Sequence, residues 1–414
     1  MLKTQAHRGR VALLTPGVGV IEDFLDSISL SLDDFCERLT GGWFFGYIDA
    51  LRSVGWEPII FLLSRNLETT TCLQHTPSGT PIFALPAGKT LHGVTRGMID
   101  RYAGLVKLTS ALAHQLRRNG CTAILTHDYE YVRFDLCAFL GMILRIPVYA
   151  TFQGASAHTR RLEHLIRPIA LRAARGLIIG ADGEAQRVIE RYGICPEKIW
   201  RIPNPIDLDL WRPMDRDEAR RALGLPSRAR IVICHGRIEI DYKGLDVLLD
   251  AWECVSGSCV GTDPVLLMIG SGPDDAILRQ RLERPGLPSV KWIDRYELDR
   301  TLMRRYLSAA DLYVLASRRE GFPVAPLEAM ACGLPIIATD IPAMVNILQQ
   351  GTASGGLIVP REDPTALAEA IQSLLINRHL CCELGQNARR NVEDRFSIES
   401  VGRQLDQMLN TSSR

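Results

Sequence analysis

The sequence lacks an apolar stretch long enough to cross a bilayer, and its first ten residues are polar and basic. A transmembrane helix needs about 20 consecutive apolar residues, and a secretory signal needs an apolar core near the N-terminus. The sequence also lacks an excess of charge of either sign, because 48 Lys and Arg residues stand beside 47 Asp and Glu residues. Such a balance does not favour bulk nucleic acid as a partner. We therefore expect a soluble cytoplasmic protein that binds no nucleic acid.

Metal-binding patterns are missing as well. The eleven cysteines are scattered, except for the neighbours Cys381 and Cys382, and none has histidines nearby at the spacing of metal ligands. Zinc ligands usually come in closely spaced pairs, and no acidic pair offers a metal-binding pattern either. An odd number of scattered cysteines fits reduced thiols. We expect no metal site.

Short apolar segments alternate with helical patterns throughout the 414 residues, which is typical of parallel sheets in α/β domains. The expected strands are residues 10–15, 58–63, 123–126, 147–152, 176–179, 230–234, 265–269, 290–293, 312–315 and 335–338. The segment R-I-P-N-P-I-D, residues 201–207, is rich in helix and strand breakers and lies near the midpoint. We therefore expect two doubly wound domains facing across a cleft, with ligands at the carboxyl ends of the strands.

Two glutamates lie eight positions apart in the run S-R-R-E-G-F-P-V-A-P-L-E-A-M-A-C-G-L-P-I-I-A, residues 317–338. Residues 324–332 are expected to form a helix, so Glu320 lies in the loop before it and Glu328 one to two turns inside it. Free backbone N–H groups at a helix start bind anions. Carboxylates on either side of a bound phosphate suit the hydroxyls of a nucleotide sugar. The alternative is that the two acids are merely favoured near a helix start.

A second segment places cations beside glycines. It reads H-G-R-I-E-I-D-Y-K-G-L-D, residues 235–246, and follows the strand expected over 230–234. Arg237 and Lys243 each adjoin a glycine, so the backbone can approach a ligand closely. Preorganised positive charge suits a diphosphate leaving group, which gains negative charge as its bond breaks. Two solvated cations in a loop are the alternative.

Together these segments resemble the retaining GT-B glycosyltransferases of family 4, the group 1 glycosyl transferases. The family signature has two glutamates separated by seven residues, and a second box reads G-R-L-x-x-x-K-G. The resemblance implies that Glu320 meets the transferred sugar, that Glu328 binds the ribose, and that Arg237 and Lys243 bind the diphosphate. Lys243 stands six residues after Arg237, where the common pattern has five, so we expect a one-residue insertion in this loop.

The resemblance extends to residues around both segments. The further donor-binding residues that it implies are Gly41, Gly42, Gly270, Ser271, Gly321, Phe322, Pro323, Val324 and Ala325. The glycine pair at 41–42 opens a helical run over 43–53. An acid-containing stretch before it, residues 16–39, is expected to form either part of an acceptor wall or a surface loop and helix.

Three candidates for binding the sugar or the acceptor follow strands of the first half. Many relatives carry histidine where this chain has Gln153, and that residue contacts the primary alcohol of the sugar. Glutamine can donate and accept hydrogen bonds but does not titrate. His127 and Asp128 follow the strand over 123–126 and are candidates for the acceptor side, with a structural role as the alternative.

A helix expected over residues 161–175 carries Arg161, Arg172 and Arg175 near one face. Leu162, Ile166 and Ile169 turn to a neighbouring apolar face. A basic face suits a phosphorylated acceptor or an anionic bilayer, and an ordinary solvated face is the alternative.

The resemblance implies an acceptor-binding domain over residues 1–200, a nucleotide-sugar-binding domain over 201–395, and a final helix in 396–414 that returns to the first domain. We expect retaining transfer of a sugar from a UDP- or GDP-sugar to a hydroxyl acceptor, in polysaccharide, glycolipid or small glycoside synthesis. Neither a cofactor nor a metal is expected. A nucleotide-sugar epimerase of the same fold and a non-catalytic nucleotide-sugar-binding protein are the alternatives. The sequence leaves open the donor base, the sugar, the acceptor and the oligomeric state.

Overall fold

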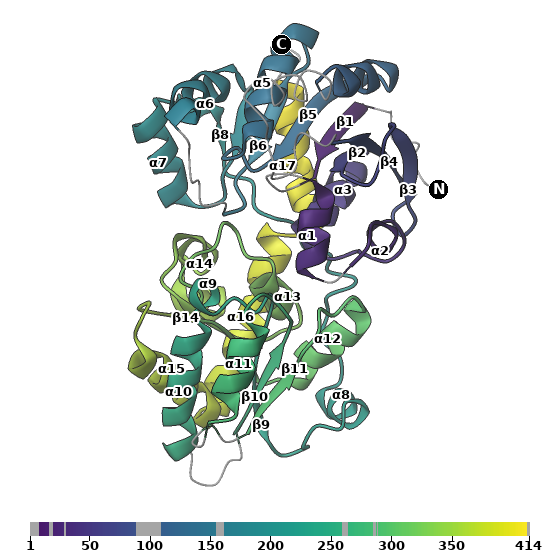
Figure 1. Ribbon diagram of the computed structural model, residues 1–414. Coiled ribbons are helices and arrows are strands. Elements are labelled where there is room, and N and C mark those ends of the chain that lie inside the picture. The colour runs from purple at the N-terminus through teal and green to yellow at the C-terminus, as the bar shows by residue number, and fades with distance from the viewer. Residues whose placement is uncertain are drawn as a thin grey trace, which may run out of the picture. The chain divides into compact units, whose positions relative to one another are not determined.

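The chain divides into two compact units (Figure 1). The computed structural model describes residues 8–15, 20–28, 30–87, 109–154, 161–258, 264–284, 287 and 289–411, with the side chains of 161–164 and 256–258 left out. Unit 1 comprises residues 1–40, 44–203 and 401–414, and unit 2 comprises 41–43 and 204–400. Each unit holds one sheet, so the expectation of two parallel-sheet α/β domains is confirmed.

Unit 1 is built on an eight-stranded sheet with the strand order β3-β4-β2-β1-β5-β6-β7-β8. Its strands are β1 (Gly9–Leu14), β2 (Trp56–Ser64), β3 (Thr71–His75), β4 (Thr80–Pro86), β5 (Cys121–His127), β6 (Val148–Thr151), β7 (Gly176–Ile178) and β8 (Ile199–Trp200). Its helices are α1 (Ile21–Ser27), α2 (Leu32–Glu37), α3 (Gly42–Ser53), residues 109–118, α5 (Val132–Leu144), α6 (Arg161–Ala173), α7 (Asp182–Tyr192) and η2 (Pro196–Lys198). All neighbouring strands run parallel except β3, which pairs antiparallel with β4.

Unit 2 is built on a six-stranded parallel sheet with the strand order β11-β10-β9-β12-β13-β14. Its strands are β9 (Arg230–His235), β10 (Pro264–Ile269), β11 (Val290–Ile293), β12 (Leu312–Leu315), β13 (Ile336–Thr339) and β14 (Gly356–Val359). Its helices are α8 (Arg216–Ala222), α9 (Ile240–Lys243), α10 (Leu245–Ser258), α11 (Asp275–Leu282), α12 (Arg300–Ala309), α13 (Ala325–Ala331), α14 (Pro342–Ile347), η3 (Gly351–Ser354), α15 (Pro364–Ile376) and α16 (Arg378–Arg395). The strand order reverses between β9 and β12, which makes the edge beside these strands a topological switch point.

Apolar side chains cover both faces of the unit 2 sheet. Ile231, Ile233 and Leu315 belong to one buried cluster, whereas Val232 and Val314 belong to another. This alternation explains why the strands read as continuous apolar runs, because helices bury both faces of a parallel sheet.

The last helix, α17 (Ile398–Asn410), ends in unit 1, to which residues 401–414 belong (Figure 1). Val401, Leu405 and Met408 are buried, and the Trp56 indole donates a hydrogen bond of 2.9 Å to Asp406 Oδ1. In the part of the chain that the structure describes, no helix combines the length and apolar character that crossing a bilayer requires.

One helix differs in detail from the sequence prediction. Helix α13 begins at Ala325, with Pro326 in its first turn, so Glu328 lies in the first turn and not one to two turns inside. Proline is well suited to a helix start because it lacks the N–H that would stay unpaired there. Four strands, β3, β4, β8 and β14, are absent from the prediction.

Candidate functional site

Polar side chains gather in unit 2 where β9 and β12 end. His235 is the last residue of β9, and the loop with Ser317 and Glu320 follows β12. A small pocket at this edge is lined by His235, Gly236, Arg237, Lys243, Tyr313 and Ser317, together with apolar residues of β9, β10 and β12. This is the location that the switch point of a doubly wound sheet predicts for a ligand.

Glu320 is held by two donors. Lys243 Nζ lies 2.6 Å from Glu320 Oε1, and Ser317 Oγ donates to the same oxygen at 2.8 Å. The Glu320 side chain is 10% exposed and that of Lys243 is 23% exposed. An ion pair that is largely shielded from water fixes both groups more firmly than a surface pair does.

The extra residue between Arg237 and Lys243 is accommodated by helix α9. This single turn ends at Gly244, which has a φ of 60°. A Cβ at Gly244 would overlap with the carbonyl oxygen of Ala316, so only glycine fits there. The tight turn brings the Lys243 ammonium to Glu320 despite the insertion.

Glu328 is held by a residue to which the sequence analysis gave no role. His235 Nε2 lies 2.9 Å from Glu328 Oε2, and each side chain is 11% exposed. Because a carboxylate only accepts hydrogen bonds, Nε2 carries the proton and donates. The Tyr313 ring packs edge-on against the imidazole, with the ring centroids 5.5 Å apart. The position of His235, at the end of a strand and before Gly236, was the signal that could have identified it.

The Arg237 side chain is more exposed than those of Lys243 and Glu320. Its guanidinium lies 2.6 Å from Glu239 Oε2 and its side chain is 45% exposed. It lines the same pocket as Lys243. The structure thus brings Arg237 to the site without pairing it with Glu320 or Glu328 among the described contacts.

Gly270 and Ser271 lie against the loop that carries Arg237. The N–H of Ile238 donates to Ser271 O at 3.1 Å, and a Cβ at Gly270 would overlap with Gly236 O. The Trp292 indole donates to Gly270 O at 2.9 Å. Two loops therefore meet at van der Waals contact, and glycine is needed where they touch.

The residues from Gly321 to Ala325 connect the Glu320 loop to α13. Phe322 is buried, and its carbonyl accepts a hydrogen bond of 2.8 Å from Asn204 Nδ2. Val324 is the N-cap residue, and its carbonyl accepts from the N–H of Glu328 at 3.0 Å. This segment therefore sets the distance between the two glutamates.

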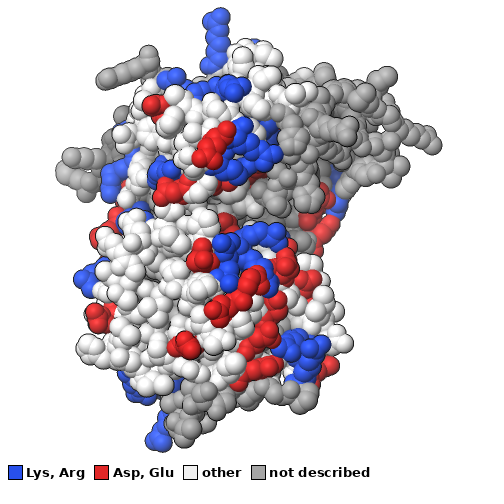
Figure 2. Space-filling model, turned by 90° about the vertical axis from the view of Figure 1, so that its left-hand side faces the viewer, with Lys and Arg blue, Asp and Glu red and all other residues white. Residues whose placement is uncertain are grey.

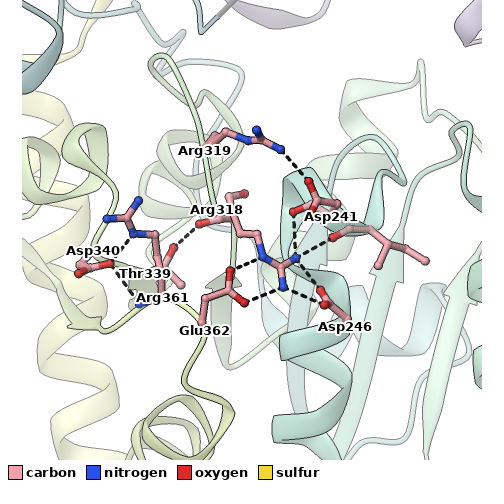
Figure 3. A network of polar contacts seen from close by, with 10 residues as sticks. Asp241, Asp246, Arg318, Arg319, Thr339, Asp340, Arg361 and Glu362 are labelled. Carbon is pink, nitrogen blue, oxygen red and sulfur yellow. Dashed lines mark hydrogen bonds and ion pairs between the residues drawn. The ribbon is translucent and has the colours of Figure 1, made fainter. Parts of the chain in front are cut away.

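An ion-pair network anchors the Glu320 loop from outside (Figure 3). Arg318 donates to both carboxylate oxygens of Asp246 at 2.8 Å and to Glu362 Oε2 at 2.8 Å, and Arg319 donates to Asp241 at 2.7 Å. Burial raises the pKa of Asp246, but the hydrogen bonds from Arg318 outweigh it, so the pKa is lowered. Basic and acidic side chains accordingly lie intermixed on this face of unit 2 (Figure 2).

The first-half candidates come together within unit 1. His127 Nδ1 lies 3.3 Å from Thr151 Oγ1, and the N–H of Gln153 donates to Asp128 Oδ2 at 3.4 Å. Asp128 is buried with a φ of 70°, a conformation that is costly for residues other than glycine. Strain of this kind is often found beside functional sites.

His127 is almost completely buried, which is unfavourable for direct contact with an acceptor. It is 3% exposed, and the Phe44 ring packs edge-on against it at 5.2 Å. Burial, with a smaller contribution from Arg133, lowers the pKa of His127 to about 3, so the imidazole is neutral at neutral pH.

The stretch before the glycine pair forms helices α1 and α2, while residues 16–19 and 29 lie outside the described part. The acidic side chains of α1 contact residues at the end of β2. Glu22 accepts from Ser64 Oγ, and Arg65 forms ion pairs with Asp23 and Asp26. Gly42 starts α3 with a φ of 77°. Residues 41–43 group with unit 2, in contrast to the rest of α3.

Comparison with known proteins identifies the family. The family model described as Glycosyltransferase Family 4 matches residues 47–210, and the one described as Glycosyl transferases group 1 matches residues 229–377. The lipopolysaccharide core biosynthesis mannosyltransferase LpsB of Rhizobium meliloti is 30% identical over 286 residues, which are 67% of this chain and 77% of LpsB. The chain belongs to the group 1 glycosyltransferases.

Other relatives of this glycosyltransferase match over different lengths. A D-inositol 3-phosphate glycosyltransferase of Mycobacterium tuberculosis is 31% identical over 76% of this chain and 69% of its own. D-inositol 3-phosphate glycosyltransferase 2 of Catenulispora acidiphila is 30% identical over 52% of this chain and 51% of its own, so the match spans about half of that relative.

Solved structures share the fold of this glycosyltransferase. Sucrose-phosphate synthase of Thermosynechococcus elongatus gives a TM-score of 0.73 at 24% identity, covering 98% of this chain and 99% of that one. HepE of Anabaena in complex with UDP-glucose gives 0.74 at 16% identity, covering 98% and 100%. The architecture is GT-B.

Proposed function

We propose that this glycosyltransferase moves a sugar from a nucleotide diphosphate donor to a hydroxyl acceptor. The observation that carries the proposal is the pairing of Glu320 with Lys243 and of Glu328 with His235 at the switch point of unit 2. Family membership supports the reaction class, and the UDP-glucose in the HepE complex supports a UDP-sugar as the first donor to try.

Glu328 binds the ribose hydroxyls in this proposal. One of its oxygens accepts from His235, and carboxylate oxygens have further lone pairs for hydroxyl donors. His235 is a positioning residue, because it acts on the ribose only through the orientation of Glu328.

Lys243 and Arg237 stabilise the departing diphosphate. The bond between the anomeric carbon and the phosphate oxygen breaks, and its electron pair goes to the diphosphate, where the two cations meet the growing charge. The phosphate oxygen takes the acceptor proton as the acceptor oxygen bonds to the same face of the sugar, which gives retention. Glu320 contacts the sugar, and its ion pair keeps Lys243 at hand before the donor arrives. The reaction uses no metal and no cofactor in this proposal.

The units divide the substrates between them. Unit 2 takes the donor, and unit 1 takes the acceptor, with the half-buried Gln153 a better candidate for substrate contact than the buried His127 and Asp128. The names of the relatives support an acceptor that is a carbohydrate or a phosphorylated polyol, since they include a lipopolysaccharide core mannosyltransferase and inositol phosphate glycosyltransferases.

A ligand panel tests the donor site. UDP, GDP and ADP are compared by thermal unfolding, because a ligand that binds only the folded state raises its stability. Glu328→Ala is expected to weaken the preferred nucleotide by about 10- to 100-fold, since a charge-assisted hydrogen bond contributes about 1.5–3 kcal/mol. The matched control is Glu369→Ala, an exposed glutamate on α15. If no nucleotide stabilises the protein, the assignment of a donor site to unit 2 is wrong.

A product assay with the corresponding nucleotide sugar separates the transferase from the epimerase. The transferase forms a glycoside only when a hydroxyl acceptor is present. An epimerase releases nucleotide or a changed sugar without an acceptor, and a non-catalytic binding protein does neither.

A further inference from the structure

Large apolar side chains are exposed together on helices α5 and α6 of unit 1. Nine such side chains are exposed in the described part of the chain, and five of them lie on these two helices. They are Val132, Met142, Ile143, Leu165 and Ile169, with exposed fractions from 39% to 74%. Scattered apolar residues are normal on a surface, but a concentration on two helices that pack together marks an interaction site.

Helix α5 is apolar except for Arg133 and Asp135. Phe134, Cys137, Ala138 and Leu140 are buried. Its exposed side chains, Val132, Met142 and Ile143, are apolar as well. A helix that is apolar on most sides is normally covered by protein or lipid, whereas these three side chains are exposed.

Helix α6 exposes two large apolar side chains. Ile169, which the sequence analysis placed on an apolar face beside the basic one, is 55% exposed, and Leu165 one turn earlier is 71% exposed. The reason is Arg167, which is fully buried and pairs with Asp135 at 2.7 Å and with Glu130 at 3.2 Å. This internal ion pair points Leu165 and Ile169 outward. The side chains of Arg161 and Leu162 lie outside the described residues.

Three arginines lie at the C-terminal ends of α5 and α6. Arg145, Arg172 and Arg175 are exposed, and Arg145 and Arg175 line a groove of about 450 Å³ with Met142 and Ala173. Among the described side chains of α5 and α6, the only carboxylate is the buried Asp135. Among its described side chains, the surface therefore combines apolar projections with positive charge and has no exposed acid on α5 or α6.

We propose that this α5–α6 surface binds the face of an anionic lipid bilayer. Met142, Ile143, Leu165 and Ile169 enter the boundary between headgroups and acyl chains, and the arginines lie against the lipid phosphates. Long arginine side chains suit this position, since their stems pack on apolar groups while the charge reaches the phosphate. A second copy of the chain is a poorer occupant, because a two-fold contact would bring the arginines of both copies together.

Sedimentation with vesicles tests the proposal on the full chain. Vesicles of phosphatidylcholine are compared with an equimolar mixture of phosphatidylcholine and phosphatidylglycerol. The protein is expected to bind the mixed vesicles and to be released by salt. Ile143→Ser combined with Leu165→Ser should lower the partition coefficient about tenfold or more, because each buried methylene contributes to membrane affinity. The control is Ile376→Ser, a side chain that is 75% exposed in unit 2.

A charge variant tests the electrostatic part. Arg145→Gln should weaken binding to the mixed vesicles several-fold, whereas Arg212→Gln, an exposed arginine of unit 2, should leave it unchanged. Thermal unfolding confirms that each variant is folded, and Met142→Gln with Ile169→Ser replaces the first pair if that pair is not.

Three results would overturn the proposal. They are absence of binding to either vesicle, equal binding to both, and unchanged binding by the apolar variants. Dimerisation that the apolar variants abolish, without vesicle binding, would assign the surface to a second copy. Nucleotide binding in unit 2 is measured separately, so failure here leaves the donor site untouched.

Discussion

Replacing His235 with alanine tests how the proposed ribose site is held. The change removes the hydrogen bond of 2.9 Å to Glu328 and leaves that carboxylate, 11% exposed, without this donor. A hydrogen bond to a charged group contributes about 1.5–3 kcal/mol, so nucleotide affinity is expected to fall about 10- to 100-fold. Turnover at saturating donor should change less, because His235 touches no reacting atom.

The assay is calorimetric titration with the nucleotide that stabilises the protein most, followed by separate measurement of kcat and KM for the donor. His235→Gln serves as the rescue, because a glutamine amide can donate to Glu328 from nearly the same position. His379→Ala, an exposed histidine on α16, is the control. Unchanged nucleotide affinity in His235→Ala would refute the positioning role. Equal losses in the alanine and glutamine variants would show that the imidazole acts through packing and not through its N–H.

Three further changes test the packing and the buried polar groups of the two units. Gly244→Ala should abolish most turnover, because its Cβ overlaps with Ala316 O, whereas Gly224→Ala, at a similar φ in open space, should cost only about 1 kcal/mol of stability. Comparable activity in the two variants would contradict this. Asp311→Ala should lower the free energy of unfolding in denaturant by about 3–5 kcal/mol, since it removes the carboxylate that pairs with Arg216 and with the buried Arg220 and Arg230 and that accepts from the N–H of Ile231. The pKa of His127 lies near 3 when folded and near 6.5 when unfolded, so the unfolded state binds the extra proton and stability falls as the pH drops from about 6.5 towards 3. His127→Gln should remove this part of the pH dependence, and an unchanged slope would place its origin elsewhere.

Most strands that the sequence predicted are apolar runs that helices bury on both faces. β12 has the predicted bounds and four buried residues, whereas β11, V-K-W-I, has the predicted bounds although Lys291 is exposed. The four missed strands lack that signal. β4 begins T-P-I-F and ends at a proline, β8 has two residues, and β14 begins at the second of two adjacent glycines. Strand order was not readable from these runs, since pairing depends on contacts between distant segments.

The sequence indicated that the charged residues of unit 2 lie close together, because they follow strands that are neighbours in a parallel sheet. Glu320 and Lys243 are 77 residues apart in the chain and 2.6 Å apart in space. Both follow strands that are neighbours in the sheet, and parallel strands end at one edge. The contact between His235 and Glu328 was not predicted, because a histidine at a strand end is more often structural, and no sequence pattern gives its side-chain direction.

The α5–α6 surface shows a limit of reading periodicity one helix at a time. The sequence analysis expected a basic face on a helix over residues 161–175. Arg172 lies in α6 and Arg175 two residues beyond its end, and both donate to backbone carbonyls, those of Tyr192 and Thr411. The largely apolar sequence of α5 is typical of a buried helix. Only the packing of the two helices shows which apolar residues stay exposed. Because both helices contribute exposed apolar residues and arginines, the surface can be recognised in the structure but not in either segment by itself.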